Sequence, residues 1–224
     1  MVNGVVRSVE LLYHQLLALG HDVRVILPLY EGIGEEWRSQ MTYLQCFHIT
    51  LAWRSPYCGI FELKRDGVTY WFVDNEYYFK RSNIYGHYDD GERFAYFSRA
   101  VVESMGWLNW HPDVLHCNDW QTALVPIYLK DDSVREERFR SIRTKSVSPI
   151  HNIEYQGRYG SQTLKDVFGL NDGYFNEHML AYHGDVNLMK GAIYAADYVT
   201  TVSPTYADEL QYSFYAHGLE GGIA

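Results

Sequence analysis

The sequence of 224 residues lacks any long hydrophobic run. No stretch approaches the roughly 18 consecutive apolar residues that a membrane span needs. The first twenty residues carry Arg7 and Glu10 inside an amphipathic pattern, unlike the apolar core of a signal peptide. The sequence therefore predicts a soluble, unexported protein without a membrane partner.

Cysteine and basic residues are also few. Cys46, Cys58 and Cys117 are an odd number without the spacing of a zinc site, which argues against a disulfide framework and a structural metal. This composition fits the reducing cytoplasm. The sequence has 19 Lys and Arg against 28 Asp and Glu, which gives a formal net charge of −9, and it contains no cluster of basic residues. Nucleic acid is therefore a poor candidate ligand.

Tyrosine, in contrast, is abundant. The 20 Tyr, 10 Phe and 6 Trp make up 16% of the chain. A tyrosine ring has an apolar face and a polar tip, which suits carbohydrate, because sugar C–H faces stack on rings while their hydroxyls seek hydrogen bonds. Any broad polar interface uses the same residue, so composition leaves both functions open.

The first ninety residues predict a helix, a strand and an antiparallel excursion. Val5, Val9, Leu12, Leu16 and Leu19 recur at helical spacing, and Gly20 follows as a C-terminal cap. Residues 23–27 are then expected to form a buried strand. Residues 29–80 alternate β-branched and aromatic runs with turn signals at Gly59 and Asp66-Gly67.

The rest of the chain alternates helices and strands. We expect helices over 90–105, from Asp119 to about 129, and over 185–196, and strands over 113–117, 145–150 and 198–202. Ser203-Pro204 is typical of a helix start. No repeat, low-complexity tract or proline-rich linker divides the sequence, so we expect one domain. This order predicts an α/β fold with a doubly wound, Rossmann-like parallel sheet.

Residues 116–122 form the first polar cluster, at the end of a predicted strand. Asp119 either caps the next helix or accepts hydrogen bonds from sugar hydroxyls, and the two roles are compatible. Zinc ligation by His111, His116, Cys117 and Asp119 is disfavoured, because the spacing matches no common site and alternate strand residues face opposite ways. We expect no metal.

Residues 149–157 form the second cluster, directly after the next strand. It contains His151, Asn152, Tyr155 and Gln156. A structural loop with a satisfied histidine is the alternative, but ligands of a doubly wound sheet sit beyond the carboxyl ends of its strands. We therefore expect Asp119, His151, Asn152 and Tyr155 to converge on one crevice. Nothing in a third segment, residues 187–207, demands catalysis.

Together these segments resemble the starch and glycogen synthases, bacterial and plant enzymes that extend α-1,4-glucan from nucleotide-activated glucose. The family pattern H-x-H-D-W-x-T-A-L corresponds to residues 116–124, with a substitution near Asn118, and H-N-x-x-Y-Q-G corresponds to residues 151–157. G-H-D-V-R-V-x-x-P matches residues 20–28, and residues 187–207 are close to a further family motif. Tyr85-Gly86 is similar to the acceptor-side tyrosine segment of the family.

The resemblance implies that residues 1–224 are the acceptor-side, N-terminal half of a two-domain GT-B glycosyltransferase. The family's first strand and its C-terminal nucleotide-binding domain, the partner of this half in the full-length protein, are outside the given sequence. The implied reaction moves glucose from ADP-glucose or UDP-glucose to the non-reducing end of an α-1,4-glucan with retention of configuration. The nucleotide sugar is a substrate, and no cofactor is implied.

The resemblance also implies residue roles. His151 and Asp119 belong to the catalytic site, and Tyr85, Asn152, Tyr155 and Gln156 contact substrate. Asn3 and Gly4 stand at the two glycines of the family's phosphate-contacting loop, where Met1 replaces its lysine and Arg7 its usual aspartate.

Two alternatives stay open. Residues 3–8 are similar to the loop of another GT-B group, which contains sucrose synthases and lipopolysaccharide or phosphatidylinositol glycosyltransferases. The chain is alternatively a non-catalytic domain, derived from the synthases, that binds glucan or a protein partner. We expect the isolated chain to bind malto-oligosaccharide without transferring glucose.

Overall fold

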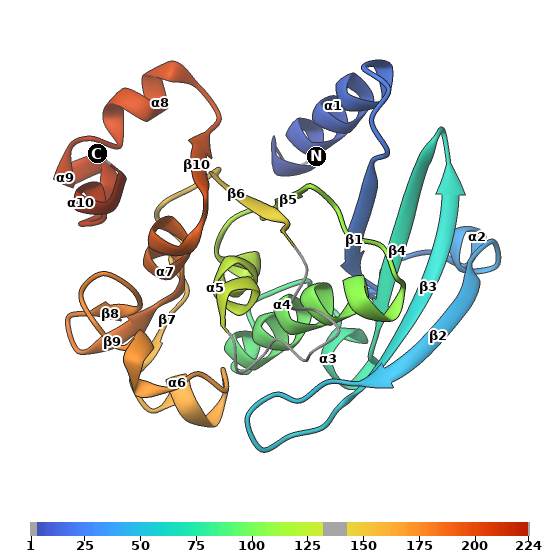
Figure 1. Ribbon diagram of the computed structural model, residues 1–224, viewed down its shortest axis with the longest axis horizontal. Helices are drawn as coiled ribbons and strands as arrows, with labels where there is room; N and C mark the ends of the chain where they lie inside the picture. The colour runs from blue at the N-terminus through green and yellow to red at the C-terminus, as the bar shows by residue number, and fades with distance from the viewer. Residues whose placement is uncertain (1–3, 132–142, 224) are drawn as a thin grey trace. The chain divides into compact units, whose positions relative to one another are not determined.

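The computed structural model describes residues 4–131 and 143–223, which fall into two compact units (Figure 1). Unit 1 runs to residue 49 and resumes over residues 55–93, and unit 2 takes residues 50–54 and 94 onwards. No linker in the sequence marks this division. Among the described helices, none is long and apolar enough to cross a membrane.

Unit 1 is built on a mixed sheet with the strand order β1-β4-β3-β2. Strand β1 runs parallel to β4, whereas β2, β3 and β4 are antiparallel neighbours, which confirms the predicted excursion. The strands are β1 (Arg24–Pro28), β2 (Thr42–His48), β3 (Tyr57–Arg65) and β4 (Val68–Asp74). The helices are α1 (Gly4–Ala18), α2 (Glu35–Arg38), α3 (Glu76–Phe79) and the first turn of α4 (Asp90–Trp107).

The two turn signals of the excursion have different outcomes. Asp66 and Gly67 have φ values of +49° and +80° and join β3 to β4 in a tight turn, as predicted. The turn predicted at Gly59 is wrong. Gly59 lies inside β3, where it pairs with Cys46 and Asp74. A Cβ at this position would lie 2.3 Å from the Tyr57 hydroxyl, so a larger residue here would displace the end of the Tyr57 side chain.

Gly20 ends α1 as predicted. Its φ is +86°, and the N–H groups of Gly20 and His21 donate to the carbonyls of Leu17 and Leu16 at 2.9 and 3.1 Å. These two bonds form a Schellman motif, which satisfies carbonyls that the helix end would leave unpaired. The cap therefore fixes where α1 stops and the chain turns toward β1.

The predicted apolar face of α1 is partly wrong. Leu12 and Leu19 are 36% and 74% exposed, whereas the Tyr13 ring packs edge-on against Tyr70 of β4, with ring centroids 6.5 Å apart. Each helical residue rotates by 100°, so a face centred on Tyr13 turns Leu12 toward solvent. Leu19 lies past Ala18, the last helical residue, and no longer follows the helical spacing.

Unit 2 contains a parallel sheet with the order β10-β6-β5. Its strands are β5 (Val114–His116), β6 (Lys145–Ile150) and β10 (Tyr198–Thr201). The larger helices of the unit are the rest of α4 with α5 (Leu124–Lys130) and α7 (Leu188–Ala195), and α5 and α7 pack side by side (Figure 1). The α/β fold with parallel strands is as predicted.

The described part of unit 2 also holds a small antiparallel sheet, β7-β9-β8, that the sequence did not suggest. The helix predicted over 185–196 begins later, because Asp185–Asn187 pair with β7 and β8 before the chain turns into α7. The remaining elements are β7 (Arg158–Gly160), β8 (Ala181–Tyr182), β9 (Asp185–Asn187), α6 (Thr163–Asp166), α8 (Pro204–Glu209), α9 (Ser213–Ala216), α10 (Glu220–Ile223) and the 3-10 turns η1 (Trp120–Thr122) and η3 (Asp172–Tyr174).

Each unit has its own apolar core. In unit 1, the face of the sheet packs beneath α2, with buried Leu29, Leu63 and Phe72. In unit 2, the end of β6 packs against α7 and the C-terminal helices, through buried Ile150, Ile153, Met189, Ile193, Leu210, Ala216 and Leu219. The second core holds the carboxyl end of β6 firmly in place, and the second polar cluster begins there.

Candidate functional site

The exits of β5 and β6 bring two of the polar clusters together. These strands are parallel neighbours, with His116 opposite Val147, so the chain leaves both at the same edge of the sheet. Asp119 Oδ1 accepts hydrogen bonds from the backbone N–H of His151 at 2.8 Å and of Asn152 at 3.5 Å. The predicted convergence of Asp119, His151 and Asn152 is confirmed, and whether they line a crevice stays a prediction.

The backbone of Asp119 adopts a conformation that non-glycine residues rarely take, with φ +55° and ψ −170°. A residue held in such a conformation typically carries a strain energy on the order of 1–3 kcal/mol, and these residues concentrate at functional sites. The Asp119 N–H donates to the Pro149 carbonyl at 3.2 Å, which together with the carboxylate contacts stabilises this geometry. This backbone conformation directs the carboxylate away from the residues that follow Asp119 and toward the end of β6.

The predicted capping role of Asp119 is wrong. The residue precedes the 3-10 turn η1, its side chain makes no cap hydrogen bond there, and α5 starts only at Leu124. The positive φ explains the difference, because it directs the carboxylate away from the following amides. One consequence is that Oδ2 has no hydrogen-bond partner among the described residues.

Burial raises the pKa of Asp119, while the hydrogen bond from the His151 amide and the proximity of the His151 ring counteract this rise. Desolvation and, to a smaller extent, His151 lower the pKa of His116 on β5. Both shifts disfavour charge at the strand exits.

Asn118 is a site residue that the sequence analysis did not assign. Its amide oxygen lies 3.0 Å from His151 Nε2. Because an amide oxygen can only accept, this contact places a proton on Nε2 and fixes the orientation of the ring. Its position in the sequence is the feature that indicates a role in the site, since Asn118 comes directly before Asp119 at the end of β5.

Asn152 and Tyr155 lie on the exposed side of the loop after β6. Asn152 Oδ1 accepts from the Glu154 N–H at 3.0 Å, and the Tyr155 N–H donates to the Asn152 carbonyl at 3.4 Å. This local turn leaves the Tyr155 side chain 62% exposed. An exposed aromatic ring beside polar groups suits sugar stacking, and the substrate contact of both residues stays a prediction.

Gln156 has a different environment from the other predicted residues. It is only 7% exposed, its Nε2 donates to the His217 carbonyl at 3.3 Å, and its Oε1 accepts from Asn187 Nδ2 at 2.6 Å. Both ends of the amide are therefore used inside the protein. Its contact with substrate stays a prediction. The bond to Asn187 connects the loop after β6, called the site loop below, to the start of α7.

Gly157 closes the second cluster because no larger residue fits there. Its φ is +63°, and a Cβ would lie 2.6 Å from Trp120 Cε3. The Trp120 ring also packs edge-on against Phe94 of α4, with ring centroids 5.2 Å apart. Trp120 follows Asp119 in the chain, so its packing against Phe94 and Gly157 fixes the backbone just after β5.

The other predicted residues belong to unit 1 or fall outside the described residues. The Tyr85 side chain is 57% exposed in the segment between α3 and α4. Asn3 lies outside the described residues. Gly4 is the first described residue of α1, and its contact with donor phosphate stays a prediction.

For metal ions, the described residues contain no group of three or more His, Cys, Asp and Glu side chains that could hold one. Cys117, which the zinc alternative needed, is 4% exposed, and burial raises the pKa of its thiol to about 12. A thiol in this state is a poor metal ligand.

Comparison with known proteins decides the family. The model of the starch synthase catalytic domain matches residues 1–224. The chain belongs to this family. The resemblance seen in the sequence motifs is therefore confirmed across the whole chain.

Bacterial glycogen synthases are among the relatives of this starch synthase family member. The chain is 47% identical to the enzyme of Geobacillus thermodenitrificans over 207 residues, which are 92% of the chain and 42% of the relative. It is 46% identical to that of Clostridium novyi over 203 residues, 90% of the chain and 42% of the relative. The chain thus spans less than half the length of the curated relatives it matches.

A solved structure of the starch synthase family supports the fold. The catalytic domain of Starch Synthase IV from Arabidopsis thaliana, bound to ADP and acarbose, matches with a TM-score of 0.88 at 30% identity. The match covers 100% of the chain and 46% of that protein. The fold is accordingly that of the N-terminal part of a GT-B glycosyltransferase.

Proposed function

We propose that the chain is the acceptor-side part of a glycosyltransferase that moves glucose from a nucleotide sugar to the non-reducing end of an α-1,4-glucan. The donor is ADP-glucose or UDP-glucose. Family membership supports glucosyl transfer, and the Arabidopsis relative was solved with ADP and acarbose, a nucleotide and a sugar-like ligand. The same proposal puts the protein in the cytoplasm.

The observation that carries the proposal is the geometry of Asp119. One carboxylate oxygen holds the His151 and Asn152 amides, and the other has no partner in the described residues. The fixed oxygen gives the loop its position, and the second oxygen can accept from a sugar hydroxyl. His151, oriented by Asn118, then lies beside the reacting glucose.

In a retaining transfer, the α-linked nucleotide sugar loses its diphosphate while the acceptor hydroxyl approaches from the same face. The developing negative charge requires preorganised hydrogen-bond donors and helix N-termini, and each such donor typically contributes about 3 kcal/mol. No metal or cofactor enters this proposal. The residues of unit 2 bind and orient sugar, and the donors that meet the diphosphate belong mostly to the half of the relatives that the chain does not match.

The first test uses the chain of 224 residues alone. It is incubated with labelled ADP-glucose, UDP-glucose and glycogen, and its affinity for malto-oligosaccharide is measured. We expect binding on the order of millimolar, as for exposed stacked sugars, and no incorporation of glucose. Sustained incorporation that disappears in His151→Ala would show that these residues suffice, and would contradict the division of roles.

The second test adds the segments of a relative that the chain does not match. Residues of this chain replace the 207 matched residues of the Geobacillus thermodenitrificans glycogen synthase, whose remaining segments are kept. We expect the chimera to transfer glucose, and His151→Ala to lower the rate by about 100-fold or more. His111→Ala is the matched control, because His111 is exposed and precedes the opposite, amino end of β5.

A non-catalytic glucan-binding domain is the second candidate. It is favoured by the replacement of the family's loop lysine by Met1. A folded chimera that binds malto-oligosaccharide but transfers no glucose, beside an active parent enzyme, would support this candidate.

A further inference from the structure

Tyr85 lies in a segment whose backbone is held from inside unit 1. The segment connects α3 to α4 and forms no helix or strand over residues 81–88. The Tyr85 side chain itself is 57% exposed and makes no hydrogen bond or ring contact within the described residues. An exposed ring on an irregular segment would be mobile unless its backbone were fixed.

Asp90, the first residue of α4, holds the segment on the C-terminal side of Tyr85. It is 7% exposed, and its Oδ2 accepts from the backbone N–H of Gly86 at 2.6 Å and of His87 at 3.1 Å. Gly86 has φ +95° with open space around its Cβ position, so its left-handed backbone, and not crowding, requires glycine. This conformation turns both amides toward Asp90.

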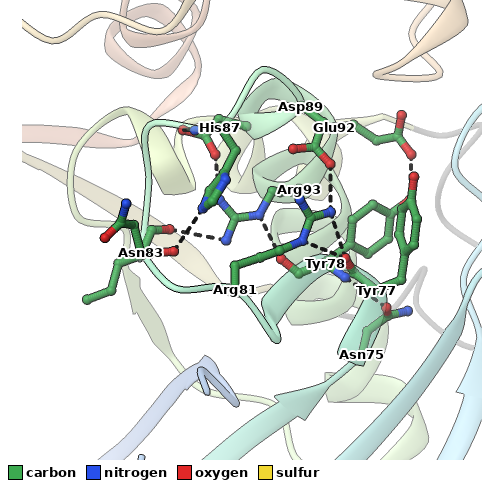
Figure 2. A network of polar contacts seen from close by, with 11 residues as sticks. Asn75, Tyr77, Tyr78, Arg81, Asn83, His87, Asp89, Glu92 and Arg93 are labelled. Carbon is green, nitrogen blue, oxygen red and sulfur yellow. Dashed lines mark hydrogen bonds and ion pairs between the residues drawn. The ribbon is translucent and has the colours of Figure 1, made fainter. Parts of the chain in front are cut away.

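Arg93 holds the segment on the N-terminal side. It is completely buried and lies inside the polar network of Figure 2. Nη2 donates to the Ile84 carbonyl at 3.2 Å, Nε donates to the Tyr78 carbonyl at 2.7 Å, and Nη1 pairs with Asp90 Oδ1 at 2.5 Å. One guanidinium therefore joins α3, α4 and the residue before Tyr85.

From these contacts we infer that Asp90 and Arg93 are positioning residues that fix the peptide of Tyr85 and so present its ring to the glucan. The inference rests on the proposed function, because it takes Tyr85 as a sugar-stacking residue. The pair bonds the backbone of residues 84, 86 and 87, on both sides of Tyr85, and touches no substrate itself. When the backbone is ordered before binding, only the two side-chain torsions of Tyr85 remain to be fixed as sugar stacks on the ring, so less entropy is lost.

Asp90→Asn is the decisive variant. Its size is unchanged, but an asparagine has one acceptor and one donor where the carboxylate accepts on both oxygens. The NH2 group of the asparagine faces either the backbone N–H groups of Gly86 and His87 or the Arg93 guanidinium. In both orientations, it places a hydrogen-bond donor opposite another donor, and one set of hydrogen bonds is lost.

Asp89→Asn is the matched control, since it makes the same change one residue earlier. The Asp89 carboxylate pairs with Arg81 at 3.0 Å rather than with the amides next to Tyr85. An asparagine oxygen can still accept from Arg81. Both variants therefore alter the charge of the same network by the same amount.

The experiment measures maltoheptaose affinity and amide hydrogen exchange of the chain by NMR. In Asp90→Asn, we expect exchange at Gly86 and His87 to accelerate about tenfold or more while β4 amides keep their protection. Affinity should fall about fivefold, against less than twofold for Asp89→Asn. In a Tyr85→Ala background, Asp90→Asn should have no further effect, since the pair acts through the ring.

Unchanged affinity in Asp90→Asn, with accelerated exchange and with Tyr85→Ala weakening binding, would overturn the inference and leave the proposed function intact. The inference would also be overturned if Asp90→Asn lowered affinity as much in the Tyr85→Ala background as in the wild type. Asp90 and Arg93 would then affect glucan binding without acting through the Tyr85 ring. A wild-type chain that binds no maltoheptaose would reject the glucan-binding proposal and the inference that rests on it.

Discussion

Gly157 shows how a single residue fixes the candidate site. Its positive φ permits the chain to turn after the H-N-x-x-Y-Q segment, and its missing side chain lets Trp120 pack against the turn. Trp120 is the residue after Asp119, so one glycine connects both polar clusters. Glycine is required at position 157 for two independent reasons: the positive φ, and the short distance to Trp120. Mutations can separate these two reasons.

We expect Gly157→Ala to lower the free energy of unfolding by about 2–4 kcal/mol, because strain at positive φ adds to overpacking against Trp120. Gly184→Ala is the control: φ is +86° and nothing lies within 4 Å of its Cβ position, so only strain of about 1 kcal/mol is expected. Urea unfolding of both variants gives the comparison. Equal losses would show that contact with Trp120 contributes nothing.

Asp197 is a second residue with a measurable role. Its Oδ2 accepts from the Ser146 N–H and hydroxyl at 2.9 and 3.1 Å, and its Oδ1 accepts from Lys145 at 2.9 Å. Burial works against ionisation, but the Ser146 amide and the Lys145 ammonium lower the pKa of Asp197 to about 2. The carboxylate anchors the start of β6, the central strand of the site.

The pKa of Asp197 predicts a pH dependence of stability. The folded value is below the ordinary value of about 3.9, so the stabilisation is complete above about pH 4 and is lost as the pH falls through 2. Unfolding free energies of the wild type and Asp197→Asn should differ by about 1–2 kcal/mol at pH 6 and converge toward pH 2. Asp172→Asn, at an exposed pair with Lys165, should differ little at any pH. A pH-independent difference for Asp197→Asn would contradict the assignment.

At the scale of elements, α7 and the site loop stabilise one another. Asn187 is fully buried and caps α7, with Oδ1 accepting from the Lys190 N–H at 3.0 Å. Its Nδ2 donates to Gln156 in the loop after β6. The helix start and the loop therefore depend on one side chain.

We expect Asn187→Ala to destabilise the chain by about 2–4 kcal/mol, because a cap is lost and the Gln156 oxygen is left buried without its donor. Ser203→Ala removes a cap alone, since the Ser203 hydroxyl accepts from the Tyr206 N–H at 3.1 Å at the start of α8. That variant should lose about 1 kcal/mol. Thermal and urea unfolding measure both, and losses of the same size would show that the bond to Gln156 adds no stability.

At the scale of the whole molecule, the residues that the resemblance assigns to substrate occur in both units, and each unit carries its own group of them. Tyr85 and Gly4 belong to unit 1, whereas Asp119 and His151 belong to unit 2. The curated relatives are more than twice as long as the region they share with this chain. The relatives therefore carry groups beyond the matched region that the proposed chemistry uses, and the chimera tests this directly.

The sequence by itself determined features that depend on neighbouring residues. The Gly20 cap, the Asp66-Gly67 turn, the bounds of β6 and the Ser203-Pro204 helix start follow from local backbone preferences, and the structure has all of them. The motifs around Asp119 and His151 identified the family for the same reason, since they are contiguous in the chain.

Only the tertiary structure decided which groups meet. The partner of the Asp119 carboxylate is 32 positions away, and that of Gln156 Oε1 is 31 positions away, at distances set by the pairing of strands and the packing of α7. Local propensity predicts a turn at Gly59 and a helix start at Asp185, because it contains no information about the neighbouring strands with which both residues pair. Hydrogen bonds across a sheet outweigh these weak preferences, and their register is fixed only when the whole sheet forms.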